Sequence, residues 1–465
     1  MGLDQRLKAL GEGASSAAMR AIKISRRPRW KQHVRENAYQ ADVLSDARQK
    51  YWVEALPQPF AIQFDTQEES AIADATESLW EMCVEFLDWF FSEDTLGEVD
   101  ARLKRLKIPA AYWQAIKNSW EREVPVEDLS LCTRFDLATT EDGQIKLLEI
   151  NGETPLLGAE TVYQWNWLAD YRCNHQKSVS PLPSNVGQFN QYWERIAGQW
   201  RKIAEDYNLR QTGISFLVDE NLEEDLEMAM QLVQIIQEEV DPNIYTQIVY
   251  LRGLEDEQGK QIQRGLGIDE EGYFIDHVNE RIRVLWKMYD WSDIQNDMAN
   301  SGMTEALAQR LETGEVKVIE PLWKQIISNK GAMALMWEQF KSSDYSPYLL
   351  ETYFDDSVSV EATALMVGMH VKKPLLGMEG VGISIETGVG ALEKHEAMGY
   401  GKEGFIIQEY VELPKAFDYH YMVGSWSVDG EPAGLIIRGD TSRITGRHCL
   451  IVPHVISDDG LYIPE

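Results

Sequence analysis

The sequence has little cysteine, no long apolar run and a deficit of positive charge. Its four cysteines, at positions 83, 132, 173 and 449, form no close pair, which argues against a zinc knuckle or a disulfide framework. No apolar run approaches the roughly 20 residues that a membrane helix needs, and the first residues lack the pattern of a signal peptide. The sequence therefore predicts a cytoplasmic protein, with reduced structural thiols, that does not enter a membrane.

The charge deficit is large, with 44 Lys and Arg against 76 Asp and Glu and a formal net charge of −32. Such a chain repels the phosphate backbone of nucleic acids, so nucleic-acid binding is excluded as a function class. A cationic substrate or partner would be attracted. An acidic surface that only keeps the protein soluble is the alternative explanation.

Positive charge is concentrated at the N-terminus. Residues 1–31 carry eight Lys or Arg and two acidic residues, a net charge of +6 that leaves −38 for the rest of the chain. Residues 11–18 are mostly small and form helices and cores poorly. We predict that residues 1–29 are a flexible basic arm that docks on the acidic body or on a protein partner. A disordered tail without a partner is the alternative.

The chain has ample material for a core: 465 residues, 44% of them hydrophobic, with 15 Trp and 19 Tyr. These values predict two or three folded domains. Apolar residues recur at three- and four-residue spacing over residues 68–91, which predicts a packing helix. Strand and helix patterns alternate over residues 214–251, and a compact unit of strands and helices follows from residue 318. The predicted fold class is α+β.

Residues 131–151 contain the strongest local signal, two alternating strands that flank Asp142-Gly143. This dipeptide favours a two-residue type I′ hairpin turn. With that turn, the residue numbers of every opposed pair sum to 285. Two polar pairs follow from this register: Asp136 with Glu149, and Arg134 with Asn151.

These four side chains share one face of the hairpin, because residues two apart on a strand point to the same side. Asp136, Glu149 and Asn151 offer hard oxygen donors of the kind that Mg²⁺ prefers. Arg134 can bind a phosphate or stabilise charge that develops in a reaction. A solvated hairpin face with an Arg–Asp ion pair is the alternative.

Several features downstream suit a nucleotide. Lys330 begins a helical segment and Lys373 ends a strand, so each can offer a positive charge to phosphates. Residues 377–382 form a glycine-rich loop whose N–H groups can face phosphate oxygens, although a surface hairpin fits the same residues. The apolar strand 405–411 ends in polar residues and can bind an adenine through its main chain. Arg438 follows another apolar strand and is expected to face the same cleft.

Together these segments resemble the synthetase half of glutathionylspermidine synthase and its stand-alone synthetase relatives. The resemblance runs from about residue 24 to the C-terminus. Its segments are Arg27-Pro28 with Trp30, residues 130–136 and 147–155, Trp286-Lys287, Glu320-Pro321, Trp323-Lys324, residues 327–330, Lys373-Pro374, residues 413–415, 424–426 and 432–434, and Arg438.

The resemblance implies an ATP-grasp fold preceded by a pre-ATP-grasp substrate domain. Residues 30–322, with the hairpin 131–151, would form the pre-ATP-grasp and substrate-binding region, and residues 323–465 the ATP-grasp nucleotide-binding region. Nothing in the chain corresponds to the amidase domain of the bifunctional enzymes, so no amidase activity is expected.

The resemblance also implies ATP and Mg²⁺ as cofactors, with two metal ions. The implied metal ligands are Asp136, Glu149 and Asn151, and the implied catalytic residue is Arg134, which would stabilise the transition state. The implied nucleotide-binding residues are Arg134, Asp136, Lys330, Lys373, Gly380 and Val381 of the phosphate-covering loop, Gln408, Glu409, Tyr410 and Val411 of the adenine-binding strand, and Arg438.

The implied reaction joins a peptide-like acid to an amine or polyamine. ATP would activate the carboxylate as an acyl phosphate, the amine would attack it, and the closed glycine-rich loop would exclude water. One alternative is a catalytically silent ATP-binding or assembly protein, suggested by Met378 and by the basic arm. Another is phosphoryl transfer without ligation.

The chain departs from the family pattern at several substrate positions. Met378 stands where the family has an arginine, Leu156 replaces a serine, and both threonines of a substrate-binding stretch are replaced within residues 286–293. A site that hydrogen-bonds a polar substrate rejects analogues without the partner group, so these changes predict a different substrate pair. The acidic segment 219–225 lies where the family binds its polyamine, and a solvated helix start is the alternative there.

Overall fold

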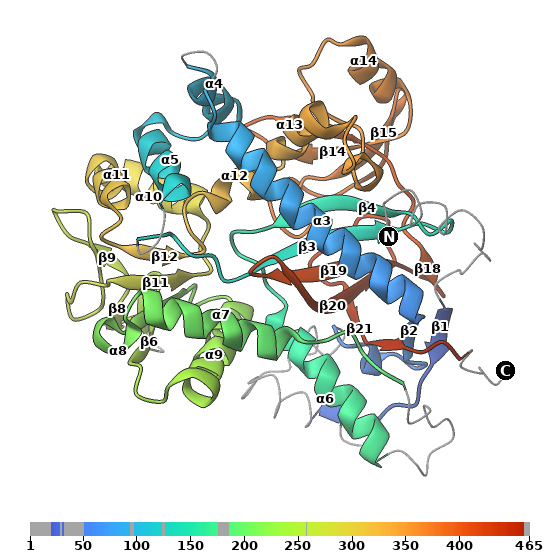
Figure 1. The fold of residues 1–465 in the computed structure, drawn as a ribbon, viewed down its shortest axis with the longest axis horizontal. Helices are drawn as coiled ribbons and strands as arrows, with labels where there is room; N and C mark the ends of the chain where they lie inside the picture. Colours follow the sequence, from blue (N-terminus) through green and yellow to red (C-terminus); the bar gives the residue numbers. More distant parts are fainter. Residues whose placement is uncertain are drawn as a thin grey trace, which may run out of the picture.

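The structure is a computed structural model, and it describes residues 20–27, 30–31, 51–93, 97–122, 126–174, 186–256 and 258–459. Helices and strands are mixed along the chain, which confirms the predicted α+β class. Three large sheets form the body, and helices cover them (Figure 1). Among these residues, no helix is both long and apolar enough to span a membrane.

The central sheet has six strands and is antiparallel throughout. Its strand order is β21 (Leu450–Val452), β20 (Glu431–Asp440), β19 (Tyr419–Val428), β3 (Thr133–Thr139) and β4 (Ile145–Asn151), and β18 (Lys415–Ala416) also pairs with β19. The hairpin β3–β4 therefore joins strands from the C-terminal part of the chain. The predicted division at residue 322 does not separate two sheets, because this one takes strands from both sides of it.

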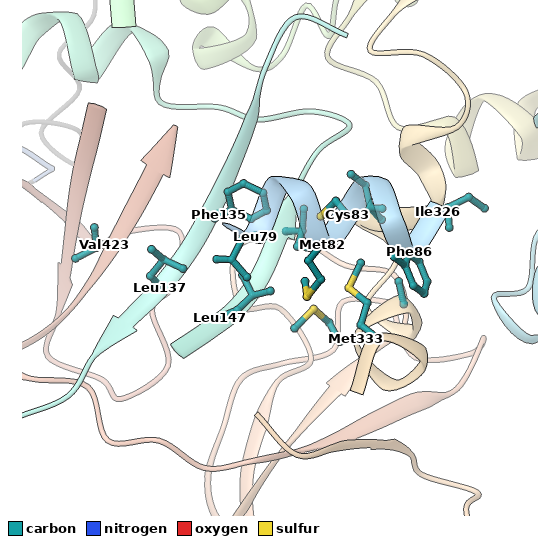
Figure 2. Close-up of a cluster of buried hydrophobic side chains, with 14 of the residues drawn as sticks. Leu79, Met82, Cys83, Phe86, Phe135, Leu137, Leu147, Ile326, Met333 and Val423 are labelled. Carbon is teal, nitrogen blue, oxygen red and sulfur yellow. The ribbon is translucent and has the colours of Figure 1, made fainter. Parts of the chain in front are cut away.

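The helix α3 (Thr66–Phe91) packs across the central sheet (Figure 1). Asp65 and Glu68 form a capping box that starts the helix. Its buried residues recur at three- and four-residue spacing, which confirms the helix predicted over residues 68–91. Figure 2 shows Leu79 and Met82 of α3 beside Phe135, Leu137 and Leu147 of β3 and β4, and Phe86 nearer to Ile326 and Met333. This contact fixes which face of the hairpin is the core face.

A second sheet has four parallel strands and carries helices after its strands. Its order is β12 (Lys317–Ile319), β11 (Val284–Lys287), β5 (Ile214–Val218) and β6 (Thr246–Tyr250). Its helices are α9 (Glu223–Ile235) with the π-helix η4 (Ile236–Val240), α10 (Trp291–Ser301) and α11 (Thr304–Thr313). All five residues of β5 are buried, as expected for an inner parallel strand. The predicted strands and helix within 214–251 are confirmed.

A third sheet has five antiparallel strands. Its order is β13 (Thr352–Phe354), β17 (Phe405–Glu409), β14 (His370–Pro374), β15 (Ser384–Thr387) and β16 (Gly390–Lys394). The helices α12 (Lys324–Ser328), α13 (Gly331–Phe340) and α14 (Val360–Val367) belong to the same part of the chain (Figure 1). The sheet brings the predicted nucleotide-binding strand β17 next to the strand that carries Lys373.

The remaining described elements are short sheets and connecting helices. The sheets are β1 (Arg20–Lys23) with β2 (Phe60–Phe64) and β22 (His454–Ile456), β7 (Gly253–Glu255) with β8 (Gln261–Arg264), and β9 (Gly267–Ile268) with β10 (Phe274–Ile275). The helices are η2 (Val53–Ala55), α4 (Glu98–Arg105), η3 (Ala110–Tyr112), α5 (Trp113–Glu121), α6 (Gly158–Asn174), α7 (Tyr192–Asp206), α8 (Leu209–Thr212) and η5 (Ser346–Tyr348).

The ordered body begins earlier than predicted. Residues 20–23 form β1, and Arg27 is buried, where its guanidinium is 2.6 Å from the Glu54 carboxylate. Strand pairing and a buried ion pair hold this segment in place, so the prediction of a flexible arm over residues 1–29 is wrong for residues 20–27. The rest of the predicted arm lies outside the described residues. The buried thiols of Cys83, Cys132 and Cys449 form no disulfide among the described residues.

Candidate functional site

The hairpin β3–β4 carries the candidate site, and its turn differs from the prediction. The Thr140 N–H donates to the Gln144 carbonyl at 2.8 Å, and the Gly143 N–H donates to the Thr140 carbonyl at 2.9 Å. Gly143 has a φ of +80°, whereas Asp142 is not in the left-handed region. The loop is therefore three residues long, with glycine at its left-handed position, and the predicted two-residue type I′ turn is wrong.

A β-bulge corrects the register before the polar residues are reached. Near the turn Leu137 pairs with Leu147, one residue out of step with the predicted register. The bulge accommodates Leu148 as an extra residue of β4, so that Asp136 faces Glu149. The predicted pairs are confirmed: Asp136 with Glu149, and Arg134 with Asn151.

The bulge also decides which face the polar side chains occupy. Leu147 is buried in the core beneath α3, so strict alternation would send Glu149 and Asn151 to that core face as well. The extra residue moves both to the opposite face, where Arg134 and Asp136 lie, and Ile150 takes the core position instead. The polar cluster therefore depends on Leu148 being accommodated as a bulge and not within the regular alternation.

Asp136 is the centre of this cluster and is completely buried. Its carboxylate accepts hydrogen bonds from Arg134 Nε at 2.8 Å and Asn151 Nδ2 at 2.9 Å, and it forms an ion pair with Arg438. Burial acts to raise the pKa of Asp136, but the charges of Arg134 and Arg438 outweigh it and hold that pKa well below its usual range. The carboxylate is therefore ionised at neutral pH and fixes both guanidinium groups.

Both predicted lysines reach this hairpin. Lys330 Nζ lies 3.4 Å from the Glu149 carboxylate and donates to the Gly377 carbonyl at 2.8 Å. Lys373 Nζ donates to the Leu148 carbonyl at 2.8 Å and to Gln408 Oε1 at 2.7 Å. Burial is the main reason that the pKa of Lys373 is lowered to about 8. The bulge residue Leu148 thus supplies a carbonyl that holds the second lysine.

A cavity of about 580 Å³ opens over the cluster. Five of the predicted site residues line it: Arg134, Glu149, Asn151, Lys330 and Arg438. The other predicted residues do not form its wall: Asp136, Lys373, Gly380, Val381, Gln408, Glu409, Tyr410 and Val411. Asp136 lies behind the wall and orients the groups that form it.

The start of the glycine-rich loop lines this cavity, whereas no residue of the predicted adenine strand does. The Val381 N–H donates to the Met378 carbonyl at 2.9 Å, so it is engaged within the loop. The side chain of Gln408 is buried and bonded to Lys373, and β17 is paired on both sides, with β13 and β14. Its Gln408 is therefore an inner-strand residue, and Tyr410 and Val411 follow the strand.

Part of the cavity lining, called the acidic end below, is rich in carboxylates. Ten Asp or Glu residues line the cavity as a whole, against four Lys or Arg. The acidic end comprises residues of α9 and α10 and their preceding loops: Glu223, Glu224, Asp225, Glu227, Asp290 and Asp293. Sequence reasoning singled out residues 219–225 and missed the contribution of Asp290 and Asp293.

The topology explains why these carboxylates meet. The strands β5 and β11 are parallel neighbours, and α9 and α10 begin beyond their carboxyl ends. Residues after such strands gather at one edge of a sheet, which is the signal that could have identified Asp290 and Asp293. Burial, the largest cause, raises the pKa of Asp225 to about 7 and that of Asp293 to about 6. These groups change charge near neutral pH.

Among the described residues, no group of three or more His, Cys, Asp or Glu side chains is placed to hold a metal. The donor set at the hairpin is instead two carboxylates and an amide, Asp136, Glu149 and Asn151. Glu149 and Asn151 face the cavity, and such oxygen donors fit a hard divalent cation that also binds nucleotide phosphates. The chemistry of the residues present is therefore compatible with Mg²⁺.

Fold and site together define a class: an α+β protein whose central hairpin brings cations and oxygen donors to a cavity that is also lined by carboxylates of other elements. The chain belongs to the glutathionylspermidine synthase preATP-grasp family, which matches residues 21–457. The family resemblance seen in the sequence is confirmed.

Relatives of known name are similar at low identity. A protein provisionally named acid–amine ligase, from Haemophilus influenzae, is 25% identical over 87% of this chain and 90% of its own length. Trypanothione synthetase from Crithidia fasciculata is 24% identical over 77% of this chain, and the bifunctional glutathionylspermidine synthetase/amidase of Escherichia coli is 22% identical over 83%. This chain spans 52% and 58% of the lengths of those last two proteins.

One solved structure has a comparable fold. A glutathione synthetase-like effector from Globodera pallida, in its apo form, superposes with a TM-score of 0.50 over 92% of this chain and 97% of its own. The two sequences are 10% identical, so the likeness concerns the fold alone.

Proposed function

We propose that this protein is an ATP-dependent acid–amine ligase with an ATP-grasp nucleotide site. The observation that carries the proposal is the cavity that is lined both by Arg134, Glu149 and Lys330 of the candidate site and by a group of carboxylates from other elements. The first group suits a nucleotide triphosphate and Mg²⁺, and the second suits a cationic amine. The names of the family and of its relatives support the same reaction class.

ATP would lie over the hairpin. Lys330 would bind its phosphates and Glu149 and Asn151 would hold Mg²⁺ from the cavity wall, while Asp136 and Lys373 would orient these groups from behind that wall. Mg²⁺ held there would supply positive charge against the phosphate oxygens. Gly380 and Val381 would belong to the loop that covers the phosphates, and the segment from Gln408 to Val411 would contact the adenine.

The reaction would proceed in two steps. A carboxylate oxygen of the acid substrate attacks the γ-phosphorus of ATP, which forms an acyl phosphate and releases ADP. The neutral amine then attacks the acyl carbon, which forms the amide, breaks the bond to the phosphate oxygen and releases phosphate. Arg134 and Arg438, both held by Asp136, would stabilise the negative charge that develops on the transferred group. No side-chain nucleophile is needed.

The amine is proposed to be a small polycation. The acidic end of the cavity would attract an ammonium group, and the carboxylates with pKa values near neutrality, Asp225 and Asp293, would accept the proton that the amine must lose. Met378, Leu156 and the altered stretch 286–293 are reasons to propose a pair other than glutathione and spermidine. Tyr289, Asp290 and Ser292 occupy that stretch.

A catalytically silent ATP-binding protein is the second candidate. The observation that favours it is Met378, an uncharged cavity-lining side chain where the family has an arginine. It differs from the ligase in one measurable way, because it would bind ATP without turning it over in the presence of any acid and amine.

The test is amine-dependent ADP release. The native chain is assayed with Mg·ATP, glutathione or γ-glutamyl dipeptides as acids, and putrescine, spermidine or ethanolamine as amines. We expect one pair to give ADP and amide in equal amounts, and Glu149→Gln to reduce the rate at least about 100-fold. The control variant is Glu77→Gln, on the exposed side of α3. ADP release that ignores the amine, or that survives Glu149→Gln, would overturn the ligase proposal.

A further inference from the structure

The loop between β20 and β21 lies against the glycine-rich loop at the edge of the cavity. A Cβ atom at Gly380 would lie 2.6 Å from the Thr445 carbonyl oxygen and 3.2 Å from a methyl carbon of Ile444. Gly380 also has a φ of +73°, a conformation that disfavours other residues. The close contact and the positive φ both require glycine at this position. Because glycine has no side chain, residues 377–382 can pack directly against residues 441–449.

Arg447 extends from the second of these loops into the cavity wall. Its Nε lies 3.4 Å from the carboxylate of Glu379, which is in the glycine-rich loop. Its Nη2 lies 3.7 Å from the carboxylate of Glu224, in the first turn of α9. One guanidinium therefore connects the loop over the predicted phosphate site with the acidic end of the cavity.

Arg447 differs from the other cations that line the cavity. Arg134, Lys330 and Arg438 form ion pairs with carboxylates of the hairpin, whereas the recorded ion pairs of Arg447 are with carboxylates outside the hairpin. Its side chain is 49% exposed, so its pairs are weak and can break and re-form. Weak pairs suit a loop that opens to exchange nucleotide and closes again.

The glycine-rich loop has no cationic side chain of its own at the cavity. Its two cavity-lining residues beyond Gly377 are Met378 and Glu379, one apolar and one acidic, and neither attracts a phosphate. Lys330 anchors the start of the loop through the Gly377 carbonyl. An anchor for its middle must come from elsewhere in the chain, and Arg447 is in position to provide it.

We propose that Arg447 is a positioning residue: through Glu379 it holds the glycine-rich loop over the triphosphate site and supplies from the 441–449 loop the cationic anchor that Met378 cannot supply. The inference rests on the proposed function for its nucleotide. It assigns Arg447 no contact with the reacting atoms.

The experiment measures binding of Mg·AMPPNP, a non-hydrolysable ATP analogue, by calorimetry, with Tm as the check on folding. We expect Arg447→Gln and Glu379→Gln each to weaken binding about fivefold without lowering Tm, since the pair is partly exposed. The double variant is expected to be no weaker than Arg447→Gln, because that substitution already removes the pair with Glu379. Arg447→Lys should recover part of the affinity. Arg443→Gln, an exposed arginine of the same loop, is the matched control.

The outcomes separate this inference from the proposed function. Native affinity in Arg447→Gln, or additive losses in the double variant, would overturn the positioning role. A native chain that binds Mg·AMPPNP but shows no amine-dependent ADP release would overturn the ligase proposal. The binding affinities of the Arg447 and Glu379 variants would then still decide the positioning role. A native chain that does not bind Mg·AMPPNP would overturn both.

Discussion

Two buried aspartates in the same cavity region have pKa values that move in opposite directions. Both lose hydration, which favours the protonated form. Asp136 lies between Arg134 and Arg438, and their charges lower its pKa below the usual range. Asp225 has Glu224 and Asp219 as charged neighbours, so its pKa stays raised, at about 7. Neighbouring charge, and not depth of burial, decides which of them is ionised at neutral pH.

Asp225 therefore makes stability depend on pH. Its pKa is 3.8 in the unfolded reference and about 7 in the fold. Between these values the native state retains a proton that the unfolded chain has released, so stability falls as pH rises and the loss is complete above pH 7. Asp225→Asn removes the cost of burying this charge. We expect it to gain on the order of 2 kcal/mol relative to the native chain between pH 5 and pH 8.

The measurement is chemical denaturation of the native chain and Asp225→Asn at both pH values. The comparison at pH 5 is the internal control, because most of the native carboxyl is still protonated there. A stability difference that is the same at pH 5 and pH 8 would contradict the assignment of a raised pKa to Asp225.

Two hairpins show how the same dipeptide forms different turns. Asp429-Gly430 joins β19 and β20 as a two-residue loop in which both residues have positive φ, +51° and +84°. Asp142-Gly143 is part of a three-residue loop instead, because the hydroxyl of Thr140 accepts the Gln144 N–H at 3.0 Å and stabilises the wider turn. The dipeptide predicts a turn in both places, and the flanking side chain selects its type.

The carbonyl of the bulge residue Leu148 has a role of its own, apart from the strand register, and deletion of Leu148 can test it. Without Leu148, the pairing near the turn would continue unbroken and still place Asp136 opposite Glu149. The lost feature would be the carbonyl that accepts the Lys373 Nζ. We expect deletion of Leu148 to preserve the fold and to weaken Mg·AMPPNP binding about tenfold, as for a lost hydrogen bond to a charged group. Calorimetry and far-UV circular dichroism measure the two effects.

Leu148→Ala is the control for that deletion, because it keeps the main-chain carbonyl and removes only part of the side chain. Its nucleotide affinity should equal that of the native chain. Equal losses in the deletion and in Leu148→Ala would show that the side chain of Leu148, and not its carbonyl, supports Lys373.

At the scale of the whole molecule, the central sheet determines how the site is built. Strand β3 pairs with β19, which lies far along the chain, and the next strand, β20, brings Arg438 next to Asp136. The parallel sheet and the five-stranded sheet then contribute the acidic end and Lys373, respectively. The site is shared by all three sheets, so no single region of the sequence contains it.

The charge of the whole molecule predicts a salt effect on the amine. The net charge of −32 and the ten carboxylates that line the cavity attract a polycation from a distance. Salt screens this long-range attraction. We expect the KM for spermidine or the active polyamine to rise about tenfold between roughly 50 and 300 mM NaCl, while kcat changes little. Steady-state assays at constant pH measure it, with Glu224→Gln expected to flatten the salt dependence. A KM that is insensitive to salt would contradict an electrostatic amine site.

Part of the site could be predicted from sequence because its signals are local. Alternation and a turn dipeptide identified the hairpin, and hard oxygen donors opposite each other identified the candidate cation site. The predicted pairing of Asp136 with Glu149 was right although the predicted turn was wrong. The longer loop takes one extra residue from the β3 side, and the bulge takes one extra residue from β4, so the two shifts in register cancel. The same local patterns could not reveal that Asp136 itself is shielded from the cavity.

The sequence by itself determined the α+β class, the long packing helix, the four polar residues of the hairpin and the family. Those follow from periodicity, residue chemistry and motif spacing, which are properties of neighbouring residues. Only the tertiary structure decided that Asp290 and Asp293 join Asp225, that Arg447 reaches Glu379, and that residues 20–27 belong to the body. Each of these depends on which strands pair and which loops meet, and such contacts between distant segments are not encoded in any local pattern.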